Sequence, residues 1–166
     1  MSHLKFAHIE YSIATRSLDI FVVGCAANPP CKDCCNPEIR DFNLKGGYST
    51  PTIIAKIAQL DMKYGNLIDK LILVGGDFCD NYKIYKDETT EFLIQLKEIT
   101  SKPLFLFTRY ELDDIPKSLL ELVDYVKTGA YIPELKTNDN IQEGIKLATS
   151  NQQIFKVSEI REKVNV

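Results

Sequence analysis

The chain has 166 residues, of which 45% are hydrophobic and 26% are charged, with a net charge of −3 and a pI near 5.4. This is the composition of an ordinary globular protein, and a chain of this length buries about 70% of its unfolded surface. We therefore expect one domain spanning residues 1–166. The acidic balance argues against nucleic acid as a direct partner.

The first residues, MSHLKFAHIEYS, lack the apolar stretch of a secretory signal, and no apolar run reaches the roughly 18 residues that cross a membrane. We expect a cytoplasmic protein with no membrane partner, and we interpret this segment as a tail in which His3 and His8 are solvated. In a reducing compartment, five cysteines, four of them between positions 25 and 35, are expected to be ligands or reactive thiols rather than a disulfide framework.

The first half of the chain alternates strands and helices. Residues 17–24, SLDIFVVG, are predicted to form a buried strand that leads into the cysteine loop. Helical spacing of apolar residues from Pro51 to Tyr64, followed by a glycine, predicts a helix. Residues 70–74, KLILV, are predicted to be a second buried strand, which stops at Gly75-Gly76.

The second half continues the same alternation. We predict helices over residues 85–100 and 118–122, strands over 103–107 and 125–127, a polar loop over 136–144 and a last strand over 153–157. Alternating strands and helices imply an α/β fold of parallel strands with right-handed crossovers. In such folds the sites lie at the carboxyl ends of the strands, where Cys25, Gly75, Thr108 and Thr128 all fall.

The segment GCAANPPCKDCCNPEIRDF, residues 24–42, contains the cysteines most suited to bind a cofactor. Thiolates spaced C-x5-C-x2-C, at Cys25, Cys31 and Cys34, can wrap a single iron–sulfur cubane. Three thiolates leave one iron with an open position, where a substrate or cofactor can bind. The alternatives are a structural zinc site completed by Cys35 or Cys79, and a loop whose cysteines bind nothing.

Other residues of the predicted strand ends have two interpretations each. Gly75 and Gly76 let a ligand approach the backbone and Asp77 can accept hydrogen bonds from an ammonium group, or the three form an ordinary tight turn with a solvated acid. Asn36 either braces the loop or contacts a cofactor. Lys127 is more often a surface residue than a ligand contact at such a position.

Several segments together resemble a known family. CKDCCNPEIRDF, residues 31–42, resembles the CKGCxNPExWDF stretch of the anaerobic ribonucleoside-triphosphate reductase activating proteins, which are small members of the radical S-adenosylmethionine (SAM) superfamily. Further matching segments are FVVGC at 21–25, LVGGD at 73–77 in place of GGEP, PLFLFTRY at 103–110, DYVKTGAYIPEL at 124–135 and SNQ at 150–152. Their order and spacing along most of the chain are more specific than any single motif.

The resemblance implies a truncated parallel β/α barrel of the radical SAM type. It implies a [4Fe-4S] cluster on Cys25, Cys31 and Cys34, and S-adenosyl-L-methionine bound at the open iron and near Asn36, Gly75, Gly76, Asp77, Thr108 and Lys127. The activity it implies is that of an oxidoreductase that cleaves SAM reductively and creates a glycyl radical on a large partner enzyme. The partner that the resemblance favours is an anaerobic ribonucleotide reductase. An electron donor such as flavodoxin or ferredoxin would supply the electron.

Two alternatives to this function stay open: a radical SAM enzyme with another substrate, and a non-catalytic accessory protein that binds a cluster or zinc. The chain also departs from the family pattern in three ways. Five residues rather than three separate Cys25 from Cys31, the family's glutamate is Asp77, and Arg40, Arg109 and Cys35 replace a tryptophan, a glycine and an aromatic residue.

Overall fold

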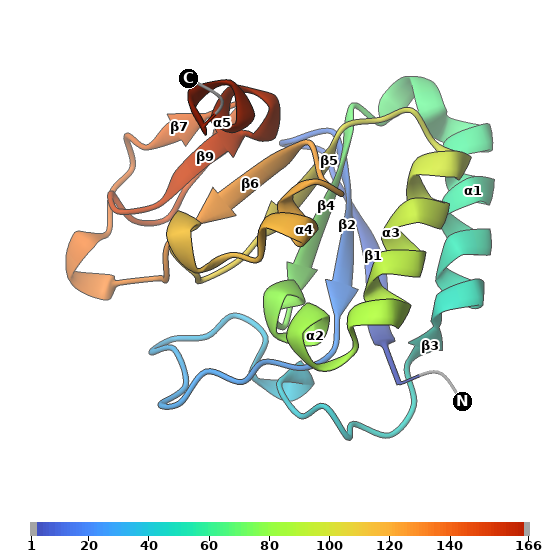
Figure 1. Ribbon diagram of the computed structural model, residues 1–166, viewed down its shortest axis with the longest axis horizontal. Coiled ribbons are helices and arrows are strands. Elements are labelled where there is room, and N and C mark those ends of the chain that lie inside the picture. The colour runs from blue at the N-terminus through green and yellow to red at the C-terminus, as the bar shows by residue number, and fades with distance from the viewer. Residues whose placement is uncertain (1–2, 165–166) are drawn as a thin grey trace.

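The computed structural model describes residues 3–164, which form a mixed α/β fold around one seven-stranded sheet (Figure 1). The strand order is β3-β1-β2-β4-β5-β6-β9. Four parallel strands form the centre of the sheet: β2 (Ser17–Val22), β4 (Lys70–Gly75), β5 (Leu104–Phe107) and β6 (Tyr125–Thr128). The flanking strands β1 (Lys5–Ser12), β3 (Tyr48–Ser49) and β9 (Gln153–Lys156) pair antiparallel with their neighbours.

The central parallel strands confirm the α/β class predicted from the alternating pattern. The sheet is open, however, with β3 and β9 at its two edges. A barrel, even a truncated one, is therefore not confirmed, and the observed architecture is a mostly parallel central sheet with antiparallel margins.

The interpretation of the amino-terminal residues as a tail is wrong. Residues Lys5–Ser12 form β1, which pairs with β2 through a tight hairpin. Leu4 and Phe6 are fully buried, and the ring of His8 stacks on Phe21 at a centroid distance of 4.2 Å. Apolar residues that alternate with polar ones suit a strand with one buried face, which explains the extra strand.

Two long helices cover one face of the sheet. Helices α1 (Thr50–Tyr64) and α3 (Lys86–Ile99) lie side by side on this face, close to their predicted bounds (Figure 1). The short helices are α2 (Phe78–Ile84), α4 (Lys117–Leu120) and α5 (Val157–Val164), of which α2 and α5 were not predicted. Single 3-10 turns occupy Pro37–Ile39, Gly65–Leu67, Leu112–Asp114 and Pro133–Leu135.

The strands alternate their side chains between two apolar clusters. On β4, Leu71 and Leu73 belong to the main core under the helices, whereas Ile72 faces the opposite side with Phe105. That smaller cluster is covered by the hairpin of β7 (Ile141–Gln142) and β8 (Ile145–Lys146), so part of the predicted polar loop is a short strand.

The carboxyl ends of β2 and β4 point toward the same end of the molecule, where the cysteine loop and α2 lie (Figure 1). Helix α5 lies at the opposite end. Within residues 3–164, no helix is long and apolar enough to cross a membrane.

Candidate iron-sulfur site

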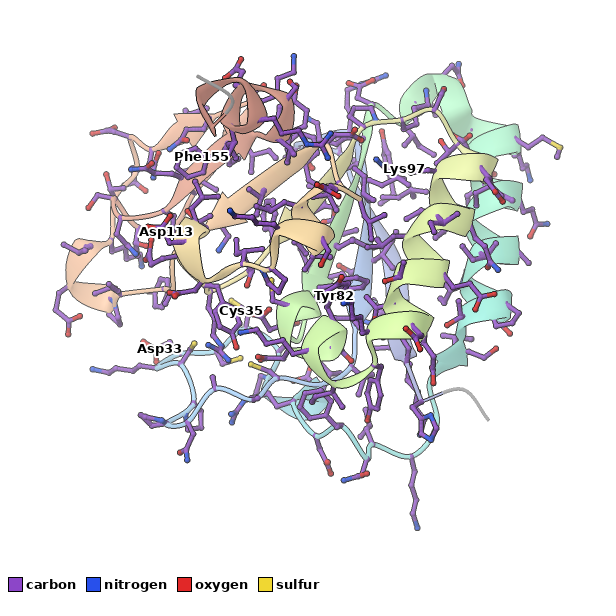
Figure 2. All side chains as sticks on the ribbon, viewed as in Figure 1. Asp33, Cys35, Tyr82, Lys97, Asp113 and Phe155 are labelled. Carbon is purple, nitrogen blue, oxygen red and sulfur yellow. The ribbon has the colours of Figure 1, made fainter. Side chains whose placement is uncertain are left out.

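The cysteine loop is closed at its base by backbone hydrogen bonds. Gly24 N donates to Ile39 O at 2.8 Å and Cys25 N donates to Arg40 O at 3.0 Å. The Arg40 guanidinium reaches back across the loop and donates from Nη2 to Ala27 O at 2.8 Å. These contacts hold residues 25–40 as one lobe, which Figure 2 shows at the end of the molecule that carries Asp33 and Cys35.

Three loop thiols lie close enough to influence one another. Cys25, Cys31 and Cys34 are half-buried, while Cys35 is exposed. Burial raises the pKa of the Cys31 thiol, and the neighbouring Cys25 and Cys34 raise it further, whereas Arg109 and Arg40 oppose this shift. The three thiols are therefore close enough to interact electrostatically. Arg109 and Arg40 also lie close enough to affect Cys31.

Three neighbouring thiols on one loop supply the kind of donors that a cubane requires. Among the side chains of residues 3–161, no group of three Cys, His, Asp or Glu is arranged to hold a single metal ion. In a cubane each thiolate binds a different iron, so the sulfurs surround the cluster instead of meeting at one point. Neighbouring thiols on one loop satisfy that requirement.

Cys79 stands apart from this donor set. It lies on α2 and is fully buried in the main core. Burial raises the pKa of its thiol to about 12, so the thiol is protonated at neutral pH, and a protonated thiol is a poor metal ligand.

The carboxylate of Asp77 is occupied by contacts within the protein. It caps α2 by accepting Cys79 N at 2.9 Å, and it accepts Thr108 Oγ1 at 2.9 and 3.0 Å and Arg109 N at 3.1 Å. Burial raises the pKa of this carboxyl, although the bonds from Arg109 N and Thr108 oppose the shift. Asp77 and Thr108 thus join the end of β4 to the end of β5, and a role in binding a cofactor stays a prediction.

The two glycines before Asp77 are required by close packing. Gly75 has φ +100°, in the left-handed region that favours glycine, and Gly76 packs so tightly that a Cβ would overlap the backbone of Gly24. Gly76 N also donates to Val22 O at 2.8 Å and Asp77 N donates to Gly24 O at 2.8 Å. The GGD segment therefore fixes the start of the cysteine loop against the end of β4.

Asn36 and Lys127 occupy different parts of the predicted site. Asn36 precedes the 3-10 turn Pro37–Ile39 and accepts Ile39 N at 3.3 Å through its main-chain carbonyl oxygen, so the role of its side chain stays a prediction. Lys127 is half-buried on β6 and donates from Nζ to Gly129 O at 3.2 Å. Burial lowers the pKa of Lys127 to about 8, against the opposing charges of Asp77 and Cys31. Its cation therefore faces the same region as the cysteine loop.

A buried polar network beside the loop was not predicted from the sequence. Asp80, on α2, is 3% exposed and accepts Ala26 N at 2.8 Å, Arg109 Nη2 at 2.9 and 3.1 Å, and Tyr110 Oη at 2.5 Å. Burial and the Asp80 carboxylate raise the pKa of Tyr110 to about 12. The sequence does show Arg109 where the activating proteins that it resembles have a glycine, and that arginine is a signal pointing to a buried acid nearby.

The late SNQ segment supports the turn after β6. Gln152 accepts Ala148 N and Thr149 N through Oε1 and donates to Gly129 O at 3.3 Å. Asn151 Nδ2 donates to Ala130 O at 2.9 Å. In this structure, Asn151 and Gln152 act by holding the backbone that follows Thr128.

Comparison with known proteins agrees with the chemistry of the loop. The family model described as the 4Fe-4S single cluster domain matches residues 15–155, which is most of the chain. The chain belongs to this family. No curated protein matches the sequence. Binding of a [4Fe-4S] cluster is the property that the family and the cysteines support together.

Proposed function

We propose that the protein is a radical SAM activase. It binds a [4Fe-4S] cluster through Cys25, Cys31 and Cys34, cleaves S-adenosylmethionine reductively and generates a glycyl radical on a large partner, an anaerobic ribonucleotide reductase. The observation that carries this proposal is a three-thiol loop, in a 4Fe-4S family, placed at the carboxyl ends of parallel strands. Three thiolates leave one iron of a cubane free for the cofactor.

Cys25, Cys31 and Cys34 would hold the cluster, which would supply one electron for cleavage of a C–S bond of the sulfonium, with methionine as the leaving group and a hydrogen atom of the partner's glycine transferred to the 5'-deoxyadenosyl carbon. A flavodoxin or ferredoxin provides that electron. The residues of the chain bind and orient the cluster and S-adenosylmethionine. Lys127 adds a cation on the side of Asp77 and Cys31, and the β4 end holds the loop in position through Gly76 and Asp77.

The proposal is tested by anaerobic reconstitution of the wild-type protein and of single cysteine-to-serine variants. Iron and sulfide counting and visible absorption should show one cluster that is lost in Cys25→Ser, Cys31→Ser and Cys34→Ser but kept in Cys35→Ser. If Cys35→Ser loses the cluster and Cys34→Ser keeps it, the ligand assignment is wrong.

The activity requires a second measurement. Reduced protein is incubated with S-adenosylmethionine and an anaerobic ribonucleotide reductase, followed by chromatography for 5'-deoxyadenosine and electron paramagnetic resonance for a glycyl doublet. Cleavage without a doublet on any glycyl-radical enzyme would favour a different substrate.

One observation favours a non-catalytic cluster-binding accessory protein as the second candidate. The Asp77 carboxylate, which we expected to receive the ammonium group of the cofactor, already accepts bonds from Cys79, Thr108 and Arg109. The two candidates differ in binding. If S-adenosylmethionine binds at Asp77, Asp77→Asn should weaken it about ten- to a hundred-fold. If a loaded, reduced cluster neither binds nor cleaves it, the accessory function is correct.

A further inference from the structure

We propose that Arg109 raises the reduction potential of the cluster through its positive charge, which Asp80 and Tyr110 hold beside the start of the cysteine loop. This inference rests on the proposed cluster at Cys25. Arg109 acts on the charge of the cluster and does not touch the substrate, so it is a tuning residue.

The guanidinium is held through one of its nitrogens, Nη2. Arg109 follows β5, and its Nη2 lies 2.9 and 3.1 Å from the two carboxylate oxygens of Asp80 and 3.3 Å from Tyr110 Oη. Its side chain is only 24% exposed and its central carbon lies 4.4 Å from the ring centroid of Tyr110. A planar guanidinium has five N–H donors in a rigid fork, and the buried Nε of Arg109 has no hydrogen-bond partner, so this donor is available to another acceptor.

Asp80 ties this cation to the cysteine loop. The charge of Asp80, the nearby Cys25 thiol and the charge of Asp77 raise the pKa of Arg109 despite its burial, so the guanidinium stays charged beside the loop. Asp80 also accepts the N–H of Ala26, the residue next to Cys25, at 2.8 Å. One buried acid therefore holds the arginine and the loop in a constant relative position.

A positive charge in this position changes the free energy of adding an electron to the cluster, and so its reduction potential. Hydrogen bonds to cluster sulfurs, net charge and exposure set the potentials of iron–sulfur centres. Reduction adds one negative charge, which a nearby positive charge stabilises, so Arg109 favours the reduced form and raises the potential. Removing it also leaves Asp80 without its counter-charge, which changes the potential in the same direction.

The test is a redox titration of reconstituted protein followed by electron paramagnetic resonance. We expect Arg109→Met to lower the midpoint potential so that the ratio of reduced to oxidised cluster at a fixed potential falls about tenfold, equivalent to 59 mV for one electron. Arg109→Lys keeps the charge without the planar fork, so its midpoint potential should lie between those of the wild-type protein and Arg109→Met. The matched control is Arg16→Met, because Arg16 pairs with Asp69 at the start of β2, away from the loop.

If Arg109→Met binds a full cluster and has the same midpoint potential as Arg16→Met, the proposal is overturned. A wild-type protein that binds no cluster overturns the proposed function with it, so the two failures are distinguishable. If Arg109→Met does not retain its cluster, the position of Arg109 is measured by electron–nuclear double resonance on reduced Arg40→Lys protein containing guanidino-¹⁵N arginine. A ¹⁵N coupling to the cluster then supports the placement of Arg109 beside it, and the absence of a coupling overturns the proposal.

Discussion

Cys79 and the loop cysteines have the same side chain but very different surroundings. Cys79 is 0% exposed, and its thiol has a pKa near 12, whereas Cys35 is exposed and the other three loop thiols are half-buried. The difference decides which thiols a reagent in solution can reach, because a buried, protonated thiol such as that of Cys79 is inert.

We therefore expect a thiol-specific reagent to modify four cysteines of the cluster-free, reduced protein and to reach the fifth only after unfolding. The measurement is absorbance on titration, followed by mass spectrometry to locate the label, with Cys79→Ala as the control that loses the slow thiol. Early labelling at Cys79 would contradict its burial. Its burial also makes stability fall as the pH rises above about 9, because the unfolded state ionises this thiol first.

Thr108 illustrates how a predicted cofactor contact can have a structural role. Its hydroxyl donates to the buried carboxylate of Asp77, and both residues are 3% exposed. Replacement by valine keeps the shape and removes the donor, so Asp77 is left with one hydrogen bond fewer in a buried site. We expect Thr108→Val to lower the free energy of unfolding by about 1–3 kcal/mol.

Urea unfolding of equally loaded proteins measures this effect. Thr52→Val is the matched control, because it also removes a hydroxyl that forms a hydrogen bond, in this case with the Ser49 hydroxyl, but at an exposed position where water can replace it. Its replacement should change stability by less than about 0.5 kcal/mol. Equal unfolding midpoints for Thr108→Val and Thr52→Val would show that the bond to Asp77 contributes nothing to stability.

The junction between β2 and β4 is the element on which the site depends. Here Gly76 lies against the backbone of Gly24, immediately before Cys25, and leaves no room for a Cβ. Because the obstructing atoms belong to the backbone, they cannot move aside as a side chain would. We expect Gly76→Ala to destabilise the protein by about 1–3 kcal/mol and to reduce cluster loading, since the start of the loop must shift.

Iron content per chain and urea unfolding measure the two effects. Gly65→Ala serves as the control, because the nearest atom to its Cβ is a side-chain oxygen of Asp61 at an ordinary contact distance of 3.5 Å. If Gly76→Ala loads iron as fully as Gly65→Ala does, the close packing does not position the loop.

The elements that the sequence predicts well have strong local patterns. The apolar runs of β2, β4 and β5 and the helical periodicity of α1 and α3 all lie within a few residues of the structure. Two missed elements lack such patterns: α2 has seven residues, and β1 looked like a polar tail until pairing with β2 gave it a buried face. Pairing between strands and curvature of the sheet depend on the whole chain, and local patterns do not contain them.

The candidate site was predictable to a similar extent. Spacing alone brought the loop cysteines together, because they share one short segment. By contrast, Asp80 could not be assigned to the site, since its three partners come from the cysteine loop and from the residues after β5. A lone acid on an unpredicted helix carries no signal until those segments are placed side by side.

At the scale of the whole molecule, the cysteine loop lies at one end of an open sheet, beyond the ends of β2 and β4 (Figure 1). Cys35 and most of residues 26–33 are exposed. A radical formed there would meet water and oxygen unless another surface covered it. If the protein activates a glycyl-radical enzyme, as proposed, that partner must complete the enclosure of the site, because closing a site excludes water and side reactions.

This enclosure predicts that air bleaches the visible absorption of the reconstituted cluster several-fold more slowly when the large glycyl-radical partner is bound. Hydrogen exchange of residues 25–40 should slow in the same complex, because docking covers the loop. An unrelated protein at equal concentration controls for non-specific scavenging of oxygen, and sedimentation establishes that the complex has formed. If the complex forms while bleaching and exchange stay at the rates of the free protein, the partner docks elsewhere and the loop delivers its chemistry without being covered.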